Sequence, residues 1–158
     1  MNLLLVIFVA IVSNALADSE NLEHLRWRVW SQHVPNIVVC NDADIDNEVL
    51  LEAINMWKSR GERIGKTVRR SCRGVPSFGD INIYESDTRP GENYGTTVTT
   101  VYLDSKKRKT NSLAYARIWI KSDYTDSVNL IAHEIGHALG YRHTSNYYSI
   151  MSTTGPIY

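Results

Sequence analysis

Two histidines and a glutamate within five residues carry the clearest chemical signal in this 158-residue chain. His133 and His137 are four residues apart, so in a helix they lie on one face, one turn apart. His143 can join them as a metal ligand if Gly140 ends the helix in a left-handed turn. Three neutral histidines leave a fourth zinc position open for water, and Glu134 stands beside the first ligand to accept a proton. The spacing therefore predicts a zinc centre built for hydrolysis.

A methionine downstream extends this pattern. Residues 133–143 read HEIGHALGYRH, and Met151 follows eight residues after the last histidine. This order resembles the metzincin superfamily of zinc endopeptidases, most closely a minimal matrixin-type catalytic domain. The resemblance implies an endopeptidase that acts on proteins or peptides, with Met151 as an apolar floor beneath the metal. It also implies an α+β fold with a twisted mixed β-sheet, two main helices and a very short C-terminal subdomain. Residues 155–158 resemble the Pro-x-Tyr wall of the matrixin specificity pocket.

The resemblance implies a mechanism in which zinc polarises the scissile carbonyl and Glu134 serves as the general base. Glu134 would take the proton of the attacking water and deliver it to the leaving amide nitrogen. Thr153 stands nearest to the place where some metzincins carry a tyrosine, so no side-chain oxyanion donor is evident. Two alternatives stay open: a helix whose histidines share a face by chance, and a catalytically silent zinc-containing peptide-binding module. The presence of Glu134 favours the enzyme, because a pure binder needs no base there.

The N-terminal segment is typical of a signal peptide. Residues 1–17 contain no charged side chain, and residues 3–12 are almost entirely apolar but too short to span a bilayer. We expect cleavage after residue 17, a catalytic domain at 18–158, and secretion to the extracellular space. Lysine plus arginine and aspartate plus glutamate each number 17, so nothing global favours nucleic acid or a membrane surface. The basic run at 106–109 is interpreted as a solvated loop, with a site for acidic substrate as the alternative.

The two cysteines, Cys40 and Cys72, are predicted to form a disulfide, because an even number of cysteines in an exported chain favours pairing. The bond would close a long loop and stabilise the fold by about 3–4 kcal/mol on the chain-entropy model. An alternative comes from residues 72–76, CRGVP, which faintly resemble the cysteine-switch peptide of matrixin proregions. In that case the thiol of Cys72 would cap the metal.

Apolar periodicity predicts the elements that position these residues. We expect strands at 26–30, 36–40, 81–84, 96–103 and 113–120. A first helix is expected at 47–59, ended by Gly61, and a second begins after Thr125 or Ser127 and carries the histidines. By analogy with metzincins, the strand at 113–120 would be the sheet edge along which an extended substrate pairs.

The metal content is predicted to be one zinc ion per chain. The other histidines, His24 and His33, lack ligand spacing and are interpreted as ordinary residues. Asp42, Asp44 and Asp46 alternate before the first helix and leave calcium as an open question, although helix capping explains them more simply. We expect a monomer.

Overall fold

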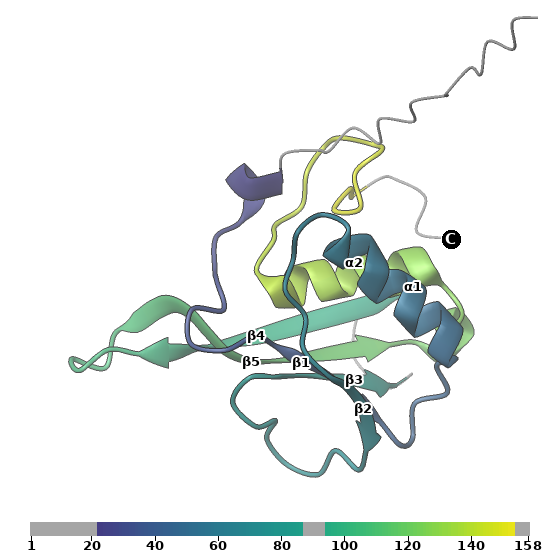
Figure 1. Ribbon diagram of the computed structural model, residues 1–158, viewed down its shortest axis with the longest axis horizontal. Helices are drawn as coiled ribbons and strands as arrows, with labels where there is room; N and C mark the ends of the chain where they lie inside the picture. The colour runs from purple at the N-terminus through teal and green to yellow at the C-terminus, as the bar shows by residue number, and fades with distance from the viewer. Residues whose placement is uncertain (1–21, 87–93, 154–158) are drawn as a thin grey trace, which may run out of the picture.

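A five-stranded mixed sheet with both helices on one face forms the framework (Figure 1). The computed structural model describes residues 22–86 and 94–153. The strands are β1 (Asn36–Cys40), β2 (Thr67–Arg70), β3 (Asp80–Glu85), β4 (Gly95–Leu103) and β5 (Lys109–Ile120), in the order β2-β1-β3-β5-β4. All neighbours are parallel except β4, which pairs antiparallel with β5. The expected α+β fold is therefore confirmed.

The core lies between the sheet and the helices. In the three central strands β1, β3 and β5, successive side chains face opposite sides of the sheet. Every second side chain therefore points to the helices. The core-facing residues of these strands are Ile37, Val39, Ile81, Ile83, Ala116, Ile118 and Ile120, all buried. Such burial supplies the main favourable term in folding, at about 25 cal/mol per Å² of apolar surface.

Each long helix begins at the residue type that the sequence favours. Helix α1 (Asn47–Lys58) starts at Asp46, whose carboxylate accepts from the backbone N–H of Glu48 at 2.7 Å. Helix α2 (Val128–Leu139) starts at Ser127, whose hydroxyl accepts from the N–H of Leu130 at 3.3 Å. These bonds satisfy N–H groups that have no partner within the helix. Short 3₁₀ turns at Leu22–Leu25 and Ser122–Tyr124 complete the helical elements among the described residues.

One predicted strand was wrong, and one strand of the sheet was not predicted. Residues 26–30 form no strand, because Arg26 and Val29 make single bridges to different partners, Tyr141 and Ser112. This segment instead crosses from the end of α2 to β5. Conversely β2 (Thr67–Arg70), a strand that was not predicted, is exposed along its whole length and so shows no apolar alternation.

The edge strand is also different from the one expected. β5 lies inside the sheet between β3 and β4, so residues 113–120 cannot receive a substrate strand. β4 is the edge on this side, and its turn to β5 carries the basic run, with Lys107 at a positive φ of 58°. The run is solvent-exposed there, and Arg108 pairs with Asp104. Any peptide that extends the sheet beside the histidines must therefore pair with β4.

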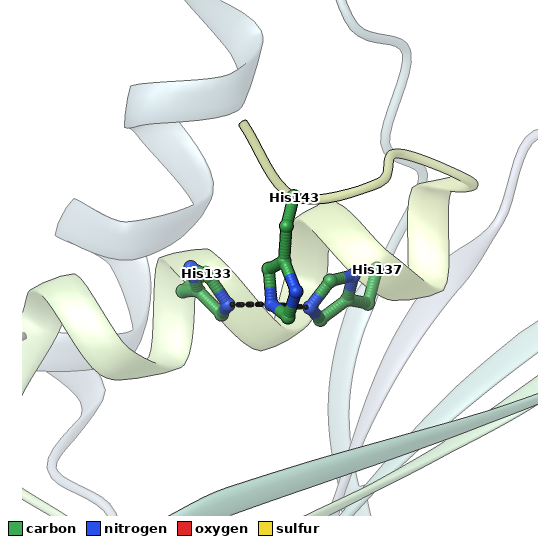
Figure 2. A group of neighbouring side chains, drawn as sticks. All are labelled: His133, His137 and His143. Carbon is green, nitrogen blue, oxygen red and sulfur yellow. Dashed lines mark hydrogen bonds between the residues drawn. The ribbon is translucent and has the colours of Figure 1, made fainter. Parts of the chain in front are cut away.

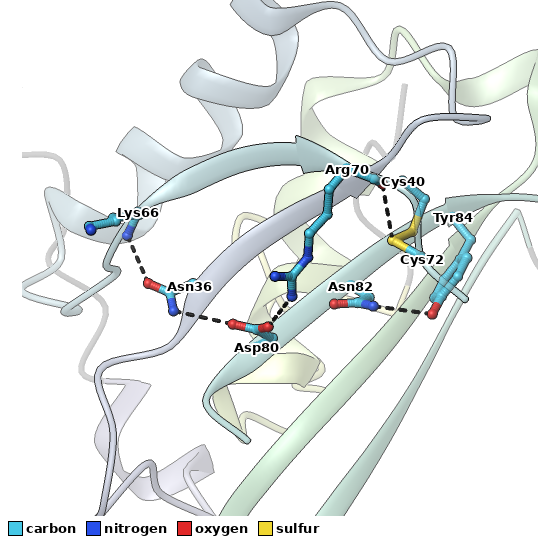
Figure 3. Close-up of polar contacts among 8 residues, drawn as sticks. All are labelled: Asn36, Cys40, Lys66, Arg70, Cys72, Asp80, Asn82 and Tyr84. Carbon is cyan, nitrogen blue, oxygen red and sulfur yellow. Dashed lines mark hydrogen bonds and ion pairs between the residues drawn. A yellow bond between two sulfur atoms is a disulfide. The ribbon is translucent and has the colours of Figure 1, made fainter. Parts of the chain in front are cut away.

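A disulfide and a polar network join the strands farthest from β4 (Figure 3). Cys40, at the end of β1, bonds to Cys72, 32 residues later, just beyond β2. Asp80 at the start of β3 accepts from Arg70 on β2 and, at 3.2 Å, from the side-chain amide of Asn36 on β1. Three neighbouring strands are thereby tied together. No helix within the described ranges has both the length and the apolar content to cross a bilayer.

Candidate active site

Three imidazoles converge at the C-terminal end of α2 (Figure 2). His133 and His137 project from one face of the helix, and Gly140 ends it at φ 100°, which turns the chain back. The Nε2 atom of His143 then lies 2.9 Å from Nε2 of His137 and 3.1 Å from Nε2 of His133. Two ligands of one tetrahedral zinc, each about 2.0–2.1 Å from it, stand ~3.3 Å apart, so the spacing suits a shared ion.

Backbone carbonyls fix the orientation of two of these rings. The Nδ1 atom of His133 lies 2.8 Å from the carbonyl oxygen of Ile150, and Nδ1 of His137 lies 3.0 Å from that of Tyr141. A carbonyl can only accept, so each Nδ1 carries the hydrogen and donates it. Each Nε2 is left with a lone pair directed at the common centre. This is the arrangement expected around a metal-binding histidine.

Desolvation also favours the neutral form of the rings, which a metal ligand requires, although His143 is the most exposed of the three. Desolvation lowers the pKa of all three histidines, and it lowers that of His137 to about 4. In His133 and His137 the hydrogen bond to the carbonyl opposes this effect without cancelling it, and a neighbouring histidine adds to the lowering. At neutral pH a zinc ion therefore need not displace protons from the ligand set. Within the part of the chain that the structure describes, no other His, Cys, Asp or Glu group of three converges in this way.

Glu134 lies against the edge strand. Its side chain is 5% exposed, and its Oε2 lies 2.5 Å from the hydroxyl of Thr97 on β4. Burial raises the pKa of Glu134 to about 7, although the Thr97 hydrogen bond opposes the shift by favouring the carboxylate. A group that titrates near neutral pH can both accept and return a proton. Gly95 makes room for it, since a Cβ at that position would lie 2.7 Å from Oε1 of Glu134.

Met151 and Trp57 pack against helix α2 at Gly136. Met151 is fully buried, and a Cβ built at Gly136 would collide with its sulfur and with the ring of Trp57. The indole N–H of Trp57, on α1, donates to the carbonyl of Ala132 at 2.6 Å. The glycine inside the metal-binding helix therefore has a packing reason, because it lets α2 rest directly on the Met151 turn.

A cleft of about 640 Å³ opens over the histidines and Glu134. β4 forms one wall through Gly95, Thr97 and Thr99, while Trp27 and Thr153 line it elsewhere. Thr153 is exposed at the rim, and the neighbouring residues 154–158 lie outside the described part of the chain, as does the segment interpreted as a signal peptide. The pocket wall predicted at 155–158 therefore remains a prediction.

The sequence predicts the histidines and the glutamate of the site but not the residues that surround them. Thr97 and Gly95 belong to β4, and Trp27 belongs to the crossing segment, all far from residue 133 in sequence. The only sequence feature that could have indicated the cleft wall is the threonine-rich strand before the basic run. The alternative in which the thiol of Cys72 caps the metal is wrong. The sulfur of Cys72 is bonded to Cys40, and no free thiol remains to reach the histidines.

The mixed sheet, the two helices and the converging histidines define a metzincin-type metallopeptidase domain. The chain belongs to the matrixin family, because the family model described as matrixin matches residues 19–156. Among solved structures it is similar to metalloproteinase-II from Bacteroides fragilis, with 15% identity and a TM-score of 0.45 over 82% of this chain. The chain spans 50% of the length of that protein. No curated protein matches the chain.

Proposed function

We propose that this chain is a secreted zinc-dependent endopeptidase. The observation that carries the proposal is the position of Glu134, a buried carboxylate with a pKa near 7 between three ligand-ready histidines and an open sheet edge. His133, His137 and His143 would hold the metal through Nε2. The zinc ion supplies, when bound, Lewis-acid polarisation of a carbonyl and a lowered pKa for a water molecule.

The side chain of Glu134 is the proton carrier in this proposal. As a carboxylate it takes a proton from the attacking water, and as a carboxylic acid it returns that proton to the departing amide nitrogen. Thr97 holds the carboxyl group at the β4 wall, since its hydroxyl lies 2.5 Å from Oε2. Burial excludes bulk water from the exchange and favours the neutral acid after the first transfer.

β4 would bind the substrate as an added strand. Its outer edge has no strand partner among the described residues, and its N-terminal half lines the cleft. Main-chain hydrogen bonds to such an edge hold any extended peptide, and side-chain pockets then provide selectivity. The disulfide supports export, because disulfides persist in oxidising compartments, and so does the apolar run at 3–12 within the uncharged residues 1–17.

Hydrolysis of a mixed peptide library by the purified zinc-loaded protein tests the proposal. We expect cleavage by the wild type, loss of cleavage with a chelator, and recovery when zinc is restored. Glu134→Gln should retain zinc and lose activity by a factor on the order of 10²–10⁴, the usual share of general acid–base catalysis. Cleavage by Glu134→Gln at the wild-type rate would remove Glu134 from the mechanism. A zinc-loaded wild type that binds peptides without cleaving them would replace the proposal with a silent peptide-binding module.

A further inference from the structure

An aromatic and cationic group stands beside the cleft and reaches it through Trp27. Trp27 lines the cleft and remains 40% exposed. The guanidinium carbon of Arg28 lies 3.7 Å from the centroid of the Trp27 ring, and that of Arg142 lies 4.6 Å from it. We call these three residues the Trp27 cluster. Cation–π contacts hold both guanidinium groups at one ring, so their central carbons lie within about 8 Å of each other.

The charge of the Trp27 cluster is not neutralised by the described part of the chain. The ion pairs there join Arg26 to Glu62, Arg70 to Asp80 and Arg108 to Asp104, and none involves Arg28 or Arg142. Arg28 donates to the hydroxyl of Thr99, which uses one of its five N–H groups and leaves others to donate. Two guanidinium groups that repel each other beside a cleft attract an anion.

The position of the cluster along β4 determines which part of a substrate it meets. Thr97 contacts Glu134, whereas Thr99, two residues further along, contacts Arg28. Two strand residues span about 6.6–6.8 Å, so the Trp27 cluster lies one such step from the reacting carbonyl. Antiparallel pairing is the more stable arrangement per residue, and it places the N-terminal part of a substrate beside the later part of β4. The second or third residue before the scissile bond therefore reaches the cluster.

We propose that the Trp27 cluster selects peptides that carry aspartate or glutamate two or three residues before the scissile bond. The proposal rests on the endopeptidase function proposed above and names its substrate class. The planar guanidinium groups of Arg28 and Arg142 donate to the substrate carboxylate, while the ring of Trp27 holds both groups beside the cleft. The chain supplies the positive side of this contact, and the substrate supplies the negative side.

Matched peptides test this inference. Pairs that differ only by glutamate or glutamine are compared at the second and third positions before the cleaved bond, and at the second position after it. The wild type should show kcat/KM about tenfold higher for glutamate on the N-terminal side, mostly through KM, as two partly exposed charge pairs allow. The preference should decrease as salt increases, because the contact is screened. After the bond, the substitution should have little effect.

Variants assign the preference to the cluster. Arg28→Gln with Arg142→Gln should bring the glutamate-to-glutamine ratio close to one, while Arg28→Lys with Arg142→Lys should keep most of it. Arg73→Gln, an exposed arginine on the loop after β2, is the matched control and should leave the ratio unchanged. A circular dichroism melt checks that each variant is folded before its ratio is compared with that of the wild type. Equal cleavage of both peptides by the wild type, or an unchanged ratio in the double glutamine variant, would overturn the inference.

Binding separates this inference from the proposed function. Fluorescence polarisation of labelled peptides on zinc-loaded Glu134→Gln protein reports the same glutamate preference without hydrolysis. If the wild type cleaves nothing but Glu134→Gln binds the glutamate peptide about tenfold more tightly than its partner, the endopeptidase proposal fails and the cluster assignment stands. If Glu134→Gln binds both peptides equally, or neither, the cluster assignment fails whatever the activity.

Discussion

The hydroxyl of Thr97 on the edge strand lies 2.5 Å from Oε2 of Glu134 on the metal-binding helix and 3.0 Å from the backbone carbonyl of Glu134. One side chain therefore links the strand that would bind a peptide to the residue that would move its protons. Strand β5 and the 3₁₀ turn Ser122–Tyr124 separate β4 from α2 along the chain, so this contact exists only in the folded protein. It provides the first of five predictions.

Thr97→Val should shift the pH dependence of cleavage. The hydroxyl lowers the pKa of Glu134, so its removal should raise that pKa further above its ordinary value. The carboxylate form then appears only at higher pH, and the acidic limb of the kcat/KM profile should move upward. Thr97→Ser, which keeps the hydroxyl, should retain the wild-type profile. Identical pH profiles for Thr97→Val and the wild type would show that the contact does not influence the base.

Gly95→Ala should reduce turnover by displacing the carboxyl group of Glu134. The added Cβ would lie 2.7 Å from Cγ and Oε1 of Glu134, so the carboxyl group must move out of position. Because the clash includes Cγ as well as Oε1, the whole side chain must shift, and a displaced base can cost on the order of 10²-fold in rate. Steady-state kinetics with thermal melts distinguishes a displaced base from disturbed packing. A variant with wild-type kcat and a strongly lowered Tm would indicate disturbed packing instead.

Glu134→Gln should stabilise the metal-free protein in a pH-dependent manner. The pKa of Glu134 is raised from 4.5 to about 7 by burial, so the folded protein binds a proton more tightly than the unfolded chain does. This group therefore contributes stability below pH 4.5, and the contribution is lost as pH rises through about 7. Glutamine has no such loss.

Calorimetry of both metal-free proteins in chelator measures this difference. The gap in Tm should be small near pH 4.5 and reach its maximum above pH 7, where it corresponds to about 3 kcal/mol at most. The histidine contributions are common to both proteins and cancel. A gap that stays constant over this pH range would contradict the assignment of a buried, neutral carboxyl group.

One zinc ion per chain is expected after dialysis, because the described residues contain one converging ligand set. Metal analysis of the wild type measures the ratio, and a value near two would require a second site. His143→Ala removes a ligand without touching the helix, so it should weaken zinc binding by orders of magnitude. When zinc is added to the metal-free proteins, it should raise the Tm of the wild type much more than the Tm of His143→Ala.

Replacing both Cys40 and Cys72 by alanine should lower stability by about 2–4 kcal/mol and leave the chemistry intact. The disulfide joins β1 to the segment after β2, on the far side of the sheet from β4. Denaturant unfolding measures the loss, and kcat/KM at a temperature well below Tm measures the chemistry. Loss of activity in a folded double variant would show that the disulfide communicates with the cleft.

The sequence predicted the parts of the site that local spacing determines. His133, Glu134 and His137 share one helix, Gly140 ends it, and the structure places His143 beside them as the spacing predicted. The positions of β1, β3, β4 and β5 followed from the composition and alternation of their residues, but β2 and the order of the strands did not. β4 and β5 have similar lengths of alternating sequence, and only the parallel pairing of β5 with β3 makes β4 the edge.

Residues that meet across the fold left no local signal. Trp27 and Arg28 looked like part of a strand because they are flanked by β-branched and aromatic residues. Their actual place depends on the N–H of Trp27, which donates to the carbonyl of Gly140 at 3.1 Å. A Cβ at Gly140 would lie 2.8 Å from the carbonyl carbon of Arg28, so the glycine is needed for this close approach as well as for the turn. Contacts of this kind depend on pairs of distant residues, which a single sequence does not reveal.

An edge that must stay open for a peptide also stays open to another copy of the same strand. β4 reads GTTVTTVYL and contains no charge and no proline, two of the features that usually block strand-to-strand aggregation. Its irregular pairing is confined to the later half, from Thr100 to Leu103, so the half beside the cleft is regular. Concentrated protein therefore has a route to self-association through the cleft wall itself. A tightly bound peptide ligand would block this route, which makes it a useful additive for storage and crystallisation.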